Sequence, residues 1–136
     1  AKLKFCQEHE IVTHFEIDPM IRKTKKESKE FEHNLARILG VFFDNAIEAT
    51  EKTKNKNINI YIYYDNQKLN FQIANTFDDT IHLNFLGKPG YSTKGKGHGY
   101  GLSLVKKIVK NEKRFHMETM ICDDVFTQTL SIMKKN

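Results

Sequence analysis

The stretch YSTKGKGHGYGLSLVKKIV (residues 91–109) holds four of the chain's seven glycines, at positions 95, 97, 99 and 101. A segment whose apolar residues recur at helical spacing follows directly. Glycine permits backbone conformations that other residues avoid and lets backbone N–H groups approach a ligand closely. The first N–H groups of a helix lack intrahelical partners and lie at the positive end of its dipole, so the stretch predicts an anion site, and phosphate is the usual anion.

Two familiar phosphate-binding motifs do not match this stretch. A Walker P-loop needs Gly-Lys followed by Ser or Thr, whereas Lys96 is followed by a glycine. The dinucleotide fingerprint belongs between the strand and the helix of a βαβ unit, and here a long loop precedes the glycines. A flexible linker or hinge is the structural alternative. The regular spacing and the helix that follows at once favour a phosphate site, to which Lys94 and Lys96 would add positive charge.

Length and composition indicate a single globular domain, residues 1–136, with room for a hydrophobic core. The formal net charge is +5, but the lysines are scattered, which disfavours nucleic acid and is compatible with an anionic small ligand. Cys6 and Cys122 are far apart and show no metal-binding spacing. No stretch is long and apolar enough to span a membrane. Because the chain starts without Met, we interpret it as a piece of a larger protein.

The hydrophobic periodicity predicts a mixture of helices and strands. Helices are expected at residues 1–10, 31–52 and 100–113, and strands at 11–18, 57–65, 68–75, 114–122 and 125–133. Residues 76–90 show no sustained period and contain a Pro-Gly pair, so we expect a long loop there. This order favours an α+β fold, a two-layer sandwich in which helices cover one face of a mixed, mostly antiparallel sheet.

The segment FEHNLARILGVFFDNAIEATEK (residues 31–52) is the clearest helix, because its apolar residues form one stripe. Gly40 lies inside it at a cost of about 1 kcal/mol relative to Ala, which a close contact between helix and sheet would explain. Asn45 and Glu48 are three residues apart and share a face. An amide oxygen suits Mg²⁺, whose other ligands are usually water and substrate phosphate. Taken alone, Asp44, Asn45 and Glu48 fit the solvent edge of an amphipathic helix better, and only the glycine run makes them a candidate site.

Together the two motifs resemble the Bergerat-fold ATP-binding family, which includes gyrase, MutL and histidine kinases. FFDNAIEA (residues 42–49) is similar to that family's N box and GKGHGYGLSLVKKI (residues 95–108) to its last glycine box. IAN (residues 73–75) stands where the first glycine box begins. The resemblance covers roughly residues 30–136 and is strongest to the catalytic domains of peptide-pheromone sensor kinases of the AgrC/ComD branch. It implies the two-layer fold named above, with ATP and Mg²⁺ as ligands.

The resemblance also implies a role for each matching residue. Asn45 would coordinate the Mg²⁺ that bridges the ATP phosphates, and Asn75 would replace the aspartate that usually hydrogen-bonds the adenine amino group. The backbone of residues 97–102 would hold the phosphates, and residues 76–96 would form a mobile lid with Phe85 in its phenylalanine region. The implied nucleotide-binding set is Asn45, Glu48, Asn75, Lys94, Lys96, Gly97, His98, Gly99, Tyr100, Gly101 and Leu102.

Three positions depart from the family pattern. Val41 stands where ATP-hydrolysing members carry the glutamate that activates water, which argues against a hydrolase. Glu48 replaces the Lys or Arg of many histidine kinases, as the pheromone-sensor branch tends to. Asn75 is followed by Thr76 and Phe77 rather than by glycines. An uncharged amide can accept a hydrogen bond from adenine, and its lack of charge predicts weak nucleotide affinity.

The resemblance implies the catalytic domain of a sensor histidine kinase in a quorum-sensing two-component system. Such a domain donates the γ-phosphoryl group of ATP to a histidine on a separate dimerisation domain, upstream of a response regulator. No catalytic residue is assigned in this chain, because none of its histidines (9, 14, 33, 82, 98 and 116) stands in a phospho-acceptor context. The parent would be a membrane-anchored dimer, with this piece cytoplasmic and monomeric alone. An anti-sigma-factor-type serine kinase of the same fold and a non-catalytic interaction module are the alternatives.

Overall fold

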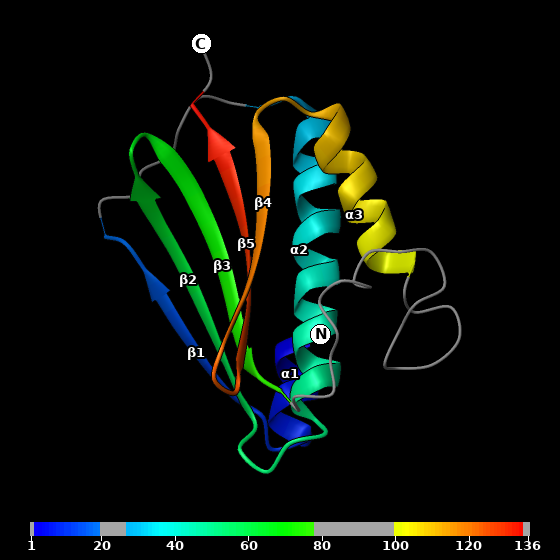
Figure 1. The fold of residues 1–136 in the computed structure, drawn as a ribbon, viewed down its shortest axis with the longest axis vertical. Coiled ribbons are helices and arrows are strands. Elements are labelled where there is room, and N and C mark those ends of the chain that lie inside the picture. The colour runs from blue at the N-terminus through cyan, green and yellow to red at the C-terminus, as the bar shows by residue number, and fades with distance from the viewer. Residues whose placement is uncertain (1, 20–26, 78–99, 135–136) are drawn as a thin grey trace.

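The computed structural model describes residues 2–19, 27–77 and 100–134. Within these residues the helices are α1 (Lys2–Glu8), α2 (Lys29–Thr50) and α3 (Tyr100–Asn111). The strands are β1 (Val12–Ile17), β2 (Asn57–Asp65), β3 (Lys68–Thr76), β4 (Phe115–Cys122) and β5 (Val125–Met133). The type and order of these elements agree with the sequence prediction (Figure 1).

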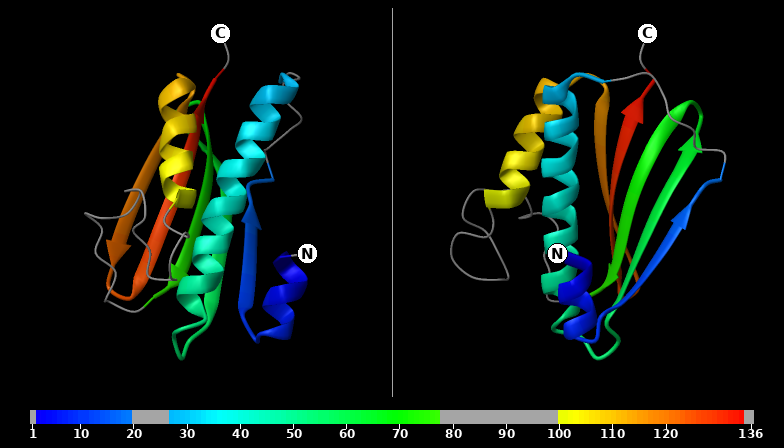
Figure 2. Two further views of the ribbon diagram at one scale, coloured as in Figure 1. Left: turned by 90° about the vertical axis from the view of Figure 1, so that its right-hand side faces the viewer. Right: turned by 180° about the vertical axis from the view of Figure 1, so that it is seen from behind.

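The strands form one five-stranded sheet in the order β1-β2-β3-β5-β4. β1 runs parallel to β2, and the other three pairs are antiparallel. The helices lie together on one face of this sheet, and the opposite face carries no helix among the described residues (Figure 2). The predicted α+β sandwich with a mixed, mostly antiparallel sheet is therefore confirmed.

Tight turns fix the register of both hairpins. Asn66 and Gln67, between β2 and β3, have φ of 50° and 66°, and Asp123, between β4 and β5, has φ of 54°. Two successive left-handed residues match the right-handed twist of the strands they join, and Asn and Asp tolerate that region better than most residues. The first turn sets a register in which Asn75 lies opposite Ile58 at the far end of the hairpin.

Helix α2 begins at a conventional cap and is held by its apolar stripe. The Ser28 hydroxyl accepts a hydrogen bond from the backbone N–H of Phe31 at 3.1 Å, which satisfies one of the free donors of the first turn. Acidic residues in that turn complement the helix dipole. The predicted stripe is confirmed: Ile38, Phe42, Ala46 and Ile47 are buried, and Leu35, Leu39 and Phe43 pack against them.

The expectation for Gly40 is wrong. A Cβ atom added there would have no atom within 4 Å, so no close contact between helix and sheet requires a glycine at this position. The close approach occurs instead at Gly101, in the first turn of α3.

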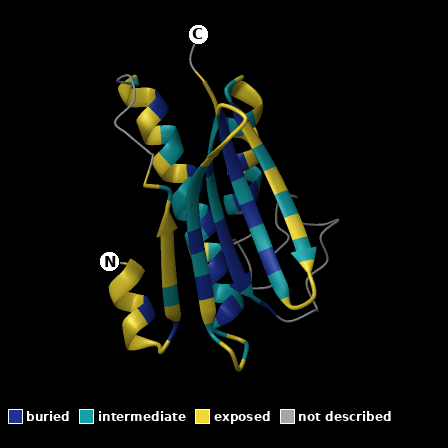
Figure 3. Ribbon diagram, turned by 90° about the vertical axis from the view of Figure 1, so that its left-hand side faces the viewer, coloured by how far each residue is buried: buried dark blue, intermediate teal, exposed yellow. Residues whose placement is uncertain are grey.

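The hydrophobic core fills the space between the helices and the sheet face that they cover, which we call the inner face. Residues directly opposite in paired strands point to the same side, so the register places Ile60, Ile73, Leu130 and Ile132 on this inner face. Edge strand β1 is mostly exposed (Figure 3). No helix among the described residues combines the length and the hydropathy that crossing a membrane requires.

Candidate functional site: two helix segments and the end of a strand

Helices α2 and α3 touch where the two sequence motifs meet. A Cβ atom added at Gly101 would lie 3.3 Å from Cγ1 of Val41, closer than most side-chain carbons approach a neighbour. The missing side chain therefore lets the first turn of α3 lie directly against α2. Asn45 follows Val41 by four residues on the same face of α2, about 6 Å along the helix axis. The start of α3 and the asparagine-bearing turn of α2 are thus neighbours.

The Asn45 side chain is half-buried, at the boundary between the core-facing and the solvent-facing sides of α2. Its side-chain amide nitrogen is buried, while the neighbouring Asp44 is exposed and forms an ion pair with Lys2 of α1. Glu48 lies one turn further along, half-buried and on the face of Asn45. The face that α2 turns towards α3 therefore carries an amide and a carboxylate next to each other.

Asn75 occupies the end of β3 on the inner face and is 3% exposed. Its Nδ2 atom donates a hydrogen bond to the carbonyl oxygen of Thr76 at 2.8 Å. With that nitrogen engaged, the Oδ1 atom is the part of the amide available to accept a hydrogen bond. The Asn75 side chain thereby keeps its Oδ1 acceptor and one further N–H donor.

A cluster of threonine hydroxyls ties the end of α2 to the end of β3. The Oγ1 atoms of Thr50 and Thr76 lie 2.6 Å apart, and the Thr76 hydroxyl donates to the carbonyl of Asn55. Thr50 is fully buried. Because Asn45 precedes Thr50 by five residues, about 7.5 Å along α2, this cluster fixes Asn75 relative to Asn45.

The predicted site residues divide into those the structure describes and those it does not. Asn45, Glu48, Asn75, Tyr100, Gly101 and Leu102 are described: Tyr100 is the first residue of α3, and the Leu102 side chain is buried in the core. Lys94, Lys96, Gly97, His98 and Gly99 lie outside the described residues, as do Phe85 and nearly all of the predicted lid. The predicted start of that lid is too early, because Thr76 still belongs to β3. Phe77 is buried against Phe126.

Sequence reasoning missed one polar residue in this region. Gln128 of β5 is 3% exposed although it carries an amide, and it lies opposite Ile73 on the inner face. Its position in the alternation VFTQTLSIM, at a spacing of two from Phe126 and Leu130, was the available signal.

A groove of the described surface lies elsewhere, at the other end of α2. It has a volume of about 720 Å³ and is lined by the first turns of α2 and the last turns of α3, with Asn34 and Arg37 on one side and Leu104 and Lys107 on the other. Asn34 precedes Asn45 by eleven residues, about 16 Å along the helix. This groove is therefore separate from the meeting point of the two motifs.

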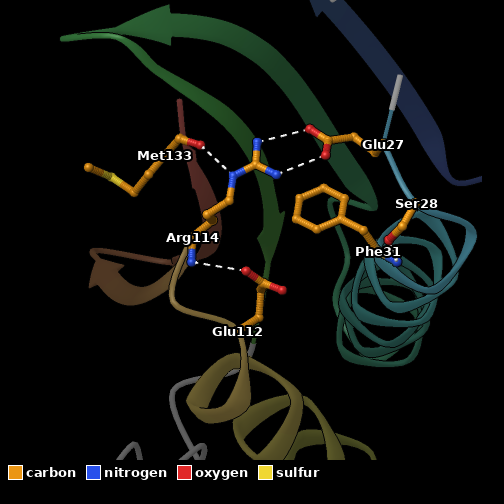
Figure 4. Close-up of polar contacts among 6 residues, drawn as sticks. All are labelled: Glu27, Ser28, Phe31, Glu112, Arg114 and Met133. Atoms are coloured by element: carbon orange, nitrogen blue, oxygen red, sulfur yellow. Dashed lines mark hydrogen bonds and ion pairs between the residues drawn. The ribbon is translucent and has the colours of Figure 1, made fainter. Parts of the chain in front are cut away.

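Arg114 links separate segments of the chain at that end of the molecule (Figure 4). Its two terminal nitrogens donate to the two carboxylate oxygens of Glu27, each at 2.9 Å, and its Nε donates to the Met133 carbonyl at 3.1 Å. The guanidinium lies 4.5 Å from the centre of the Phe31 ring. The hydrogen bonds to Glu27 raise the pKa of Arg114, so the group stays charged, and this arrangement joins the start of α2 to the end of β5.

Comparisons with known proteins agree with this architecture. The family model for the GHKL domain matches residues 32–133, three quarters of the chain. No curated protein sequence matches the chain. Solved structures of similar fold include the Acinetobacter baumannii histidine kinase AdeS, with a TM-score of 0.71 and 16% identity over 99% of this chain and 62% of that one. The chain thus spans less than two thirds of the AdeS chain.

Two further solved structures share this fold. The catalytic domain of histidine kinase ThkA gives a TM-score of 0.72 and 22% identity, over 97% of this chain and 84% of that one. Full-length ShkA, solved in complex with AMPPNP, gives a TM-score of 0.73 and 14% identity, over 96% of this chain and 28% of that one. At these identities the likeness establishes the shared fold.

Proposed function

This chain belongs to the GHKL domain family, and we propose that it is the ATP-binding catalytic domain of a sensor histidine kinase. Its role would be to bind ATP with Mg²⁺ and to present the γ-phosphoryl group to a histidine on a separate dimerisation domain. The pairing of DNAIEA (residues 44–49) with STKGKGHGYGLSLV (residues 92–105) favours the peptide-pheromone branch of these kinases, and with it a quorum-sensing system.

The contact between Val41 and Gly101 is the observation that supports the proposal most strongly. It makes neighbours of two motifs sixty residues apart. One contains the start of a helix, whose first N–H groups lack intrahelical partners, and the other contains the amide of Asn45. A triphosphate held at the start of α3 would have Asn45 within reach of its metal. Lys94, Lys96 and His98 would add phosphate contacts from the glycine-rich segment.

The donor set fits Mg²⁺ rather than a metal that needs a full protein cage. The described residues contain no group of three or more His, Cys, Asp or Glu side chains able to hold a metal ion. Mg²⁺ requires only one or two oxygen ligands from a protein when phosphates supply the rest, and Asn45, with Glu48 on the same face, can provide them. When bound, Mg²⁺ would neutralise charge on the phosphates during transfer.

The chain's own residues would position the nucleotide and leave the nucleophile to a partner. In the transfer, the bond between the γ-phosphorus and the β,γ-bridging oxygen breaks, a phosphorus–nitrogen bond forms to the partner's imidazole, and ADP leaves. Val41 packs against Gly101 and has no group that could activate water. Asn75 would direct its Oδ1 acceptor at the adenine amino group. We therefore propose a phosphoryl donor with little ATPase activity.

The same proposal implies several properties of the parent protein. It would be a membrane-anchored dimer that carries the phospho-acceptor histidine and acts on a response regulator, and the present domain would be cytoplasmic and monomeric alone. The ThkA kinase has been solved in complex with the response regulator TrrA, and this chain shares that kinase's fold with a TM-score of 0.71.

Two alternatives make different predictions. An anti-sigma-factor-type serine kinase of this fold would phosphorylate a serine of a protein partner, and the valine at position 41 counts against it. A non-catalytic interaction module would bind no nucleotide, so its thermal stability would not change with an ATP analogue and Mg²⁺. A ligand at a hundred times its Kd adds about 2.7 kcal/mol to the free energy of unfolding.

The test combines binding with label transfer. We expect an ATP analogue with Mg²⁺ to raise the unfolding temperature of the isolated domain, and EDTA to remove most of that rise. With γ-labelled ATP, the isolated domain should stay unlabelled, while the dimerisation domain of the parent, added in trans, should gain acid-labile label. Stable label on the isolated domain, or acid-stable label on a serine, would overturn the histidine-kinase proposal.

A further inference from the structure

Strand β1 forms one edge of the sheet and exposes apolar side chains. Among the described strands it pairs with β2 alone, and it lies at the end of the strand order (Figure 1). Val12, Phe15 and Ile17 are 62%, 46% and 55% exposed. The strand contains no lysine or proline, two residues that commonly protect an exposed edge from pairing. The edge of β1 is therefore suited to accept a further strand.

The hydrogen bonds to the β2 segment show which backbone groups of β1 point the other way. The N–H groups of Val12 and Asp18 donate to the carbonyls of Lys56 and Ile62, at 2.8 and 2.9 Å. Successive residues of a strand direct their N–H and C=O groups to opposite sides, so the even-numbered residues of β1 face β2. The residues whose N–H and C=O groups point away from β2 are Thr13, Phe15 and Ile17.

The side chains of β1 alternate between the two faces of the sheet. Phe15 lies opposite Ile60 of β2, which belongs to the inner face, so Thr13 and Ile17 share that face with Phe15. His14 and Glu16 point to the outer face, and both are exposed. The edge thus offers apolar side chains on one face and a donor and an acceptor on the other.

We propose that β1 pairs antiparallel with β1 of a second copy of this chain, about a two-fold axis at Phe15. Phe15 then lies opposite Phe15 of the second copy, and Thr13 lies opposite Ile17. These are the residues whose N–H and C=O groups point outward, so each pair exchanges both backbone hydrogen bonds. The two sheets become one continuous sheet, through a contact that uses the same surface of each copy.

The polar side chains select this register. On the outer face, His14 of each copy lies opposite Glu16 of the other, in a pair without backbone hydrogen bonds, where side chains are closer. An imidazole N–H can donate to that carboxylate whether the ring is protonated or neutral. Moving the axis by one residue sets His14 opposite His14 or Glu16 opposite Glu16, and both hydrogen bonds between His14 and Glu16 are lost.

Strand β4, at the other edge of the sheet, is less suited to such pairing. It also carries a histidine and a glutamate two residues apart, His116 and Glu118. However, the N–H group of Phe115 beside them already donates to the Glu112 carbonyl at 3.1 Å. The residues of β4 on the inner face are buried or half-buried, unlike Phe15 and Ile17. β4 therefore serves as the internal control.

The proposed contact is small, because it involves one strand of six residues. Small interfaces give weak and transient association, so we expect a monomer at micromolar concentration and pairing near about 1 mM. In the dimeric parent of the proposed function, a linker would supply an effective concentration of that order. The two domains of one parent dimer would then pair. Self-association of the chain itself does not depend on nucleotide binding.

The test follows the whole chain by nuclear magnetic resonance from about 20 µM to about 2 mM. We expect the amide signals of Thr13, Phe15 and Ile17 to move with concentration. In a mixture of labelled and unlabelled chains, an isotope-filtered NOE should join the methyl groups of Thr13 in one copy and Ile17 in the other. Within one copy these residues lie about 13 Å apart along the strand, so this NOE reports only the contact between copies.

A proline at the edge gives a matched pair of variants. Thr13→Pro removes an outward N–H group and leaves the bonds to β2 intact, a position where edge strands tolerate proline. It should weaken self-association at least about tenfold. Thr119→Pro makes the same change in β4, where the N–H group of Thr119 points away from β5. This control should leave self-association unchanged.

A charge exchange tests the register and does not depend on the proline variants. His14→Glu sets two carboxylates opposite each other and should weaken self-association about tenfold. Adding Glu16→His restores a donor opposite an acceptor, so most of the association should return. His116→Glu, on β4, should have no effect.

The outcomes decide the inference separately from the nucleotide site. Wild-type chains that show no change up to about 2 mM would overturn it. Equal losses in Thr13→Pro and Thr119→Pro would also overturn it, because they would show that β1 has no special part. Association that does not return in the exchanged variant would rule out the register about Phe15. Pairing in a chain that binds no ATP would support this inference even if the proposed function failed.

Discussion

The two ends of helix α2 carry polar groups of different kinds. At its start, Arg114 and Glu27 form a bidentate ion pair that the Phe31 ring covers, and the Met133 carbonyl accepts a further hydrogen bond. Every one of these contacts joins two parts of the chain. A charged pair held by several hydrogen bonds and largely withdrawn from solvent is suited to fixing the fold.

Towards its other end, α2 meets neutral amides and a missing side chain. Asn45, Asn75 and Gln128 are buried or half-buried, with the half-buried carboxylate of Glu48 beside Asn45, and Gly101 opens the start of α3 to close approach. Amides beside a helix N-terminus, with one carboxylate to share a cation, suit an anionic ligand that brings a metal ion. The groove lined by Arg114 therefore lies at the stabilising end of α2, whereas the residues suited to binding gather towards its other end.

Of the substitutions considered, replacement of Asn45 should lower activity most. We expect Asn45→Ala to lower the rate of phosphotransfer from ATP by roughly 100-fold or more, because the Mg²⁺ at the phosphates would lose its amide oxygen ligand. The readout is label transfer to the dimerisation domain of the parent kinase. Asn34→Ala is the matched control, an asparagine on the same helix that lines the distant groove. If the two variants lost activity equally, it would be wrong to assign nucleotide binding to the Asn45 end of α2 and stabilisation of the fold to its start.

Removing the ion pair tests the stabilising end. Arg114→Ala should lower the free energy of unfolding by about 2 kcal/mol, because it leaves the Glu27 carboxylate without its partner on a side chain that is only 20% exposed. Chemical denaturation measures the change, and ATP affinity per folded molecule should stay the same. A large loss of ATP affinity in the folded variant would mean that the groove, and not the Asn45 end, contacts the nucleotide.

A methyl group at Gly101 tests whether the contact between α2 and α3 positions the phosphate site. Gly101→Ala would place a carbon 3.3 Å from Val41 Cγ1, so we expect α3 to shift and ATP binding to weaken about tenfold. Val41→Ala removes the opposing atom. In the double variant most of the affinity should return, which a double-mutant cycle detects as coupling. Purely additive effects would show that this contact does not position the phosphate site.

The ion pair between Lys2 and Asp44 should have the smallest effect, although it lies beside Asn45. Both side chains are about half exposed, and exposed pairs contribute little because water and salt screen them. Lys2→Ala should therefore leave thermal stability and ATP affinity almost unchanged at physiological salt. A marked loss of ATP affinity would show that α1 takes part in the site.

Much of the fold could be predicted from local patterns, and the site only in part. The apolar stripe of α2 and the alternation of the hairpins identified the elements, since both signals lie within one segment. The reason given for Gly40 was wrong, because a helical stripe does not say what packs opposite each residue. The Val41–Gly101 contact joins positions that only the tertiary structure brings together.

Two other features could not be found without the register. The pair of Arg114 and Glu27 joins residues 87 positions apart, and nothing in either local sequence marks the partner. Gln128 stands two residues from Phe126 and Leu130, so the local alternation already places it on their face. Only the pairing of β5 with β3 shows that this position lies diagonally beside Asn75.

Nuclear magnetic resonance gives the most direct test, with a non-hydrolysable ATP analogue and Mg²⁺ titrated into the isotopically labelled domain. We expect the backbone amides of residues 101–103 and the side-chain amide of Asn45 to shift together with one Kd, while the Nε–H signal of Arg114 stays in place. Shifts confined to the surroundings of Arg114, or separate Kd values for Asn45 and the start of α3, would contradict a single nucleotide site shared by these two helices.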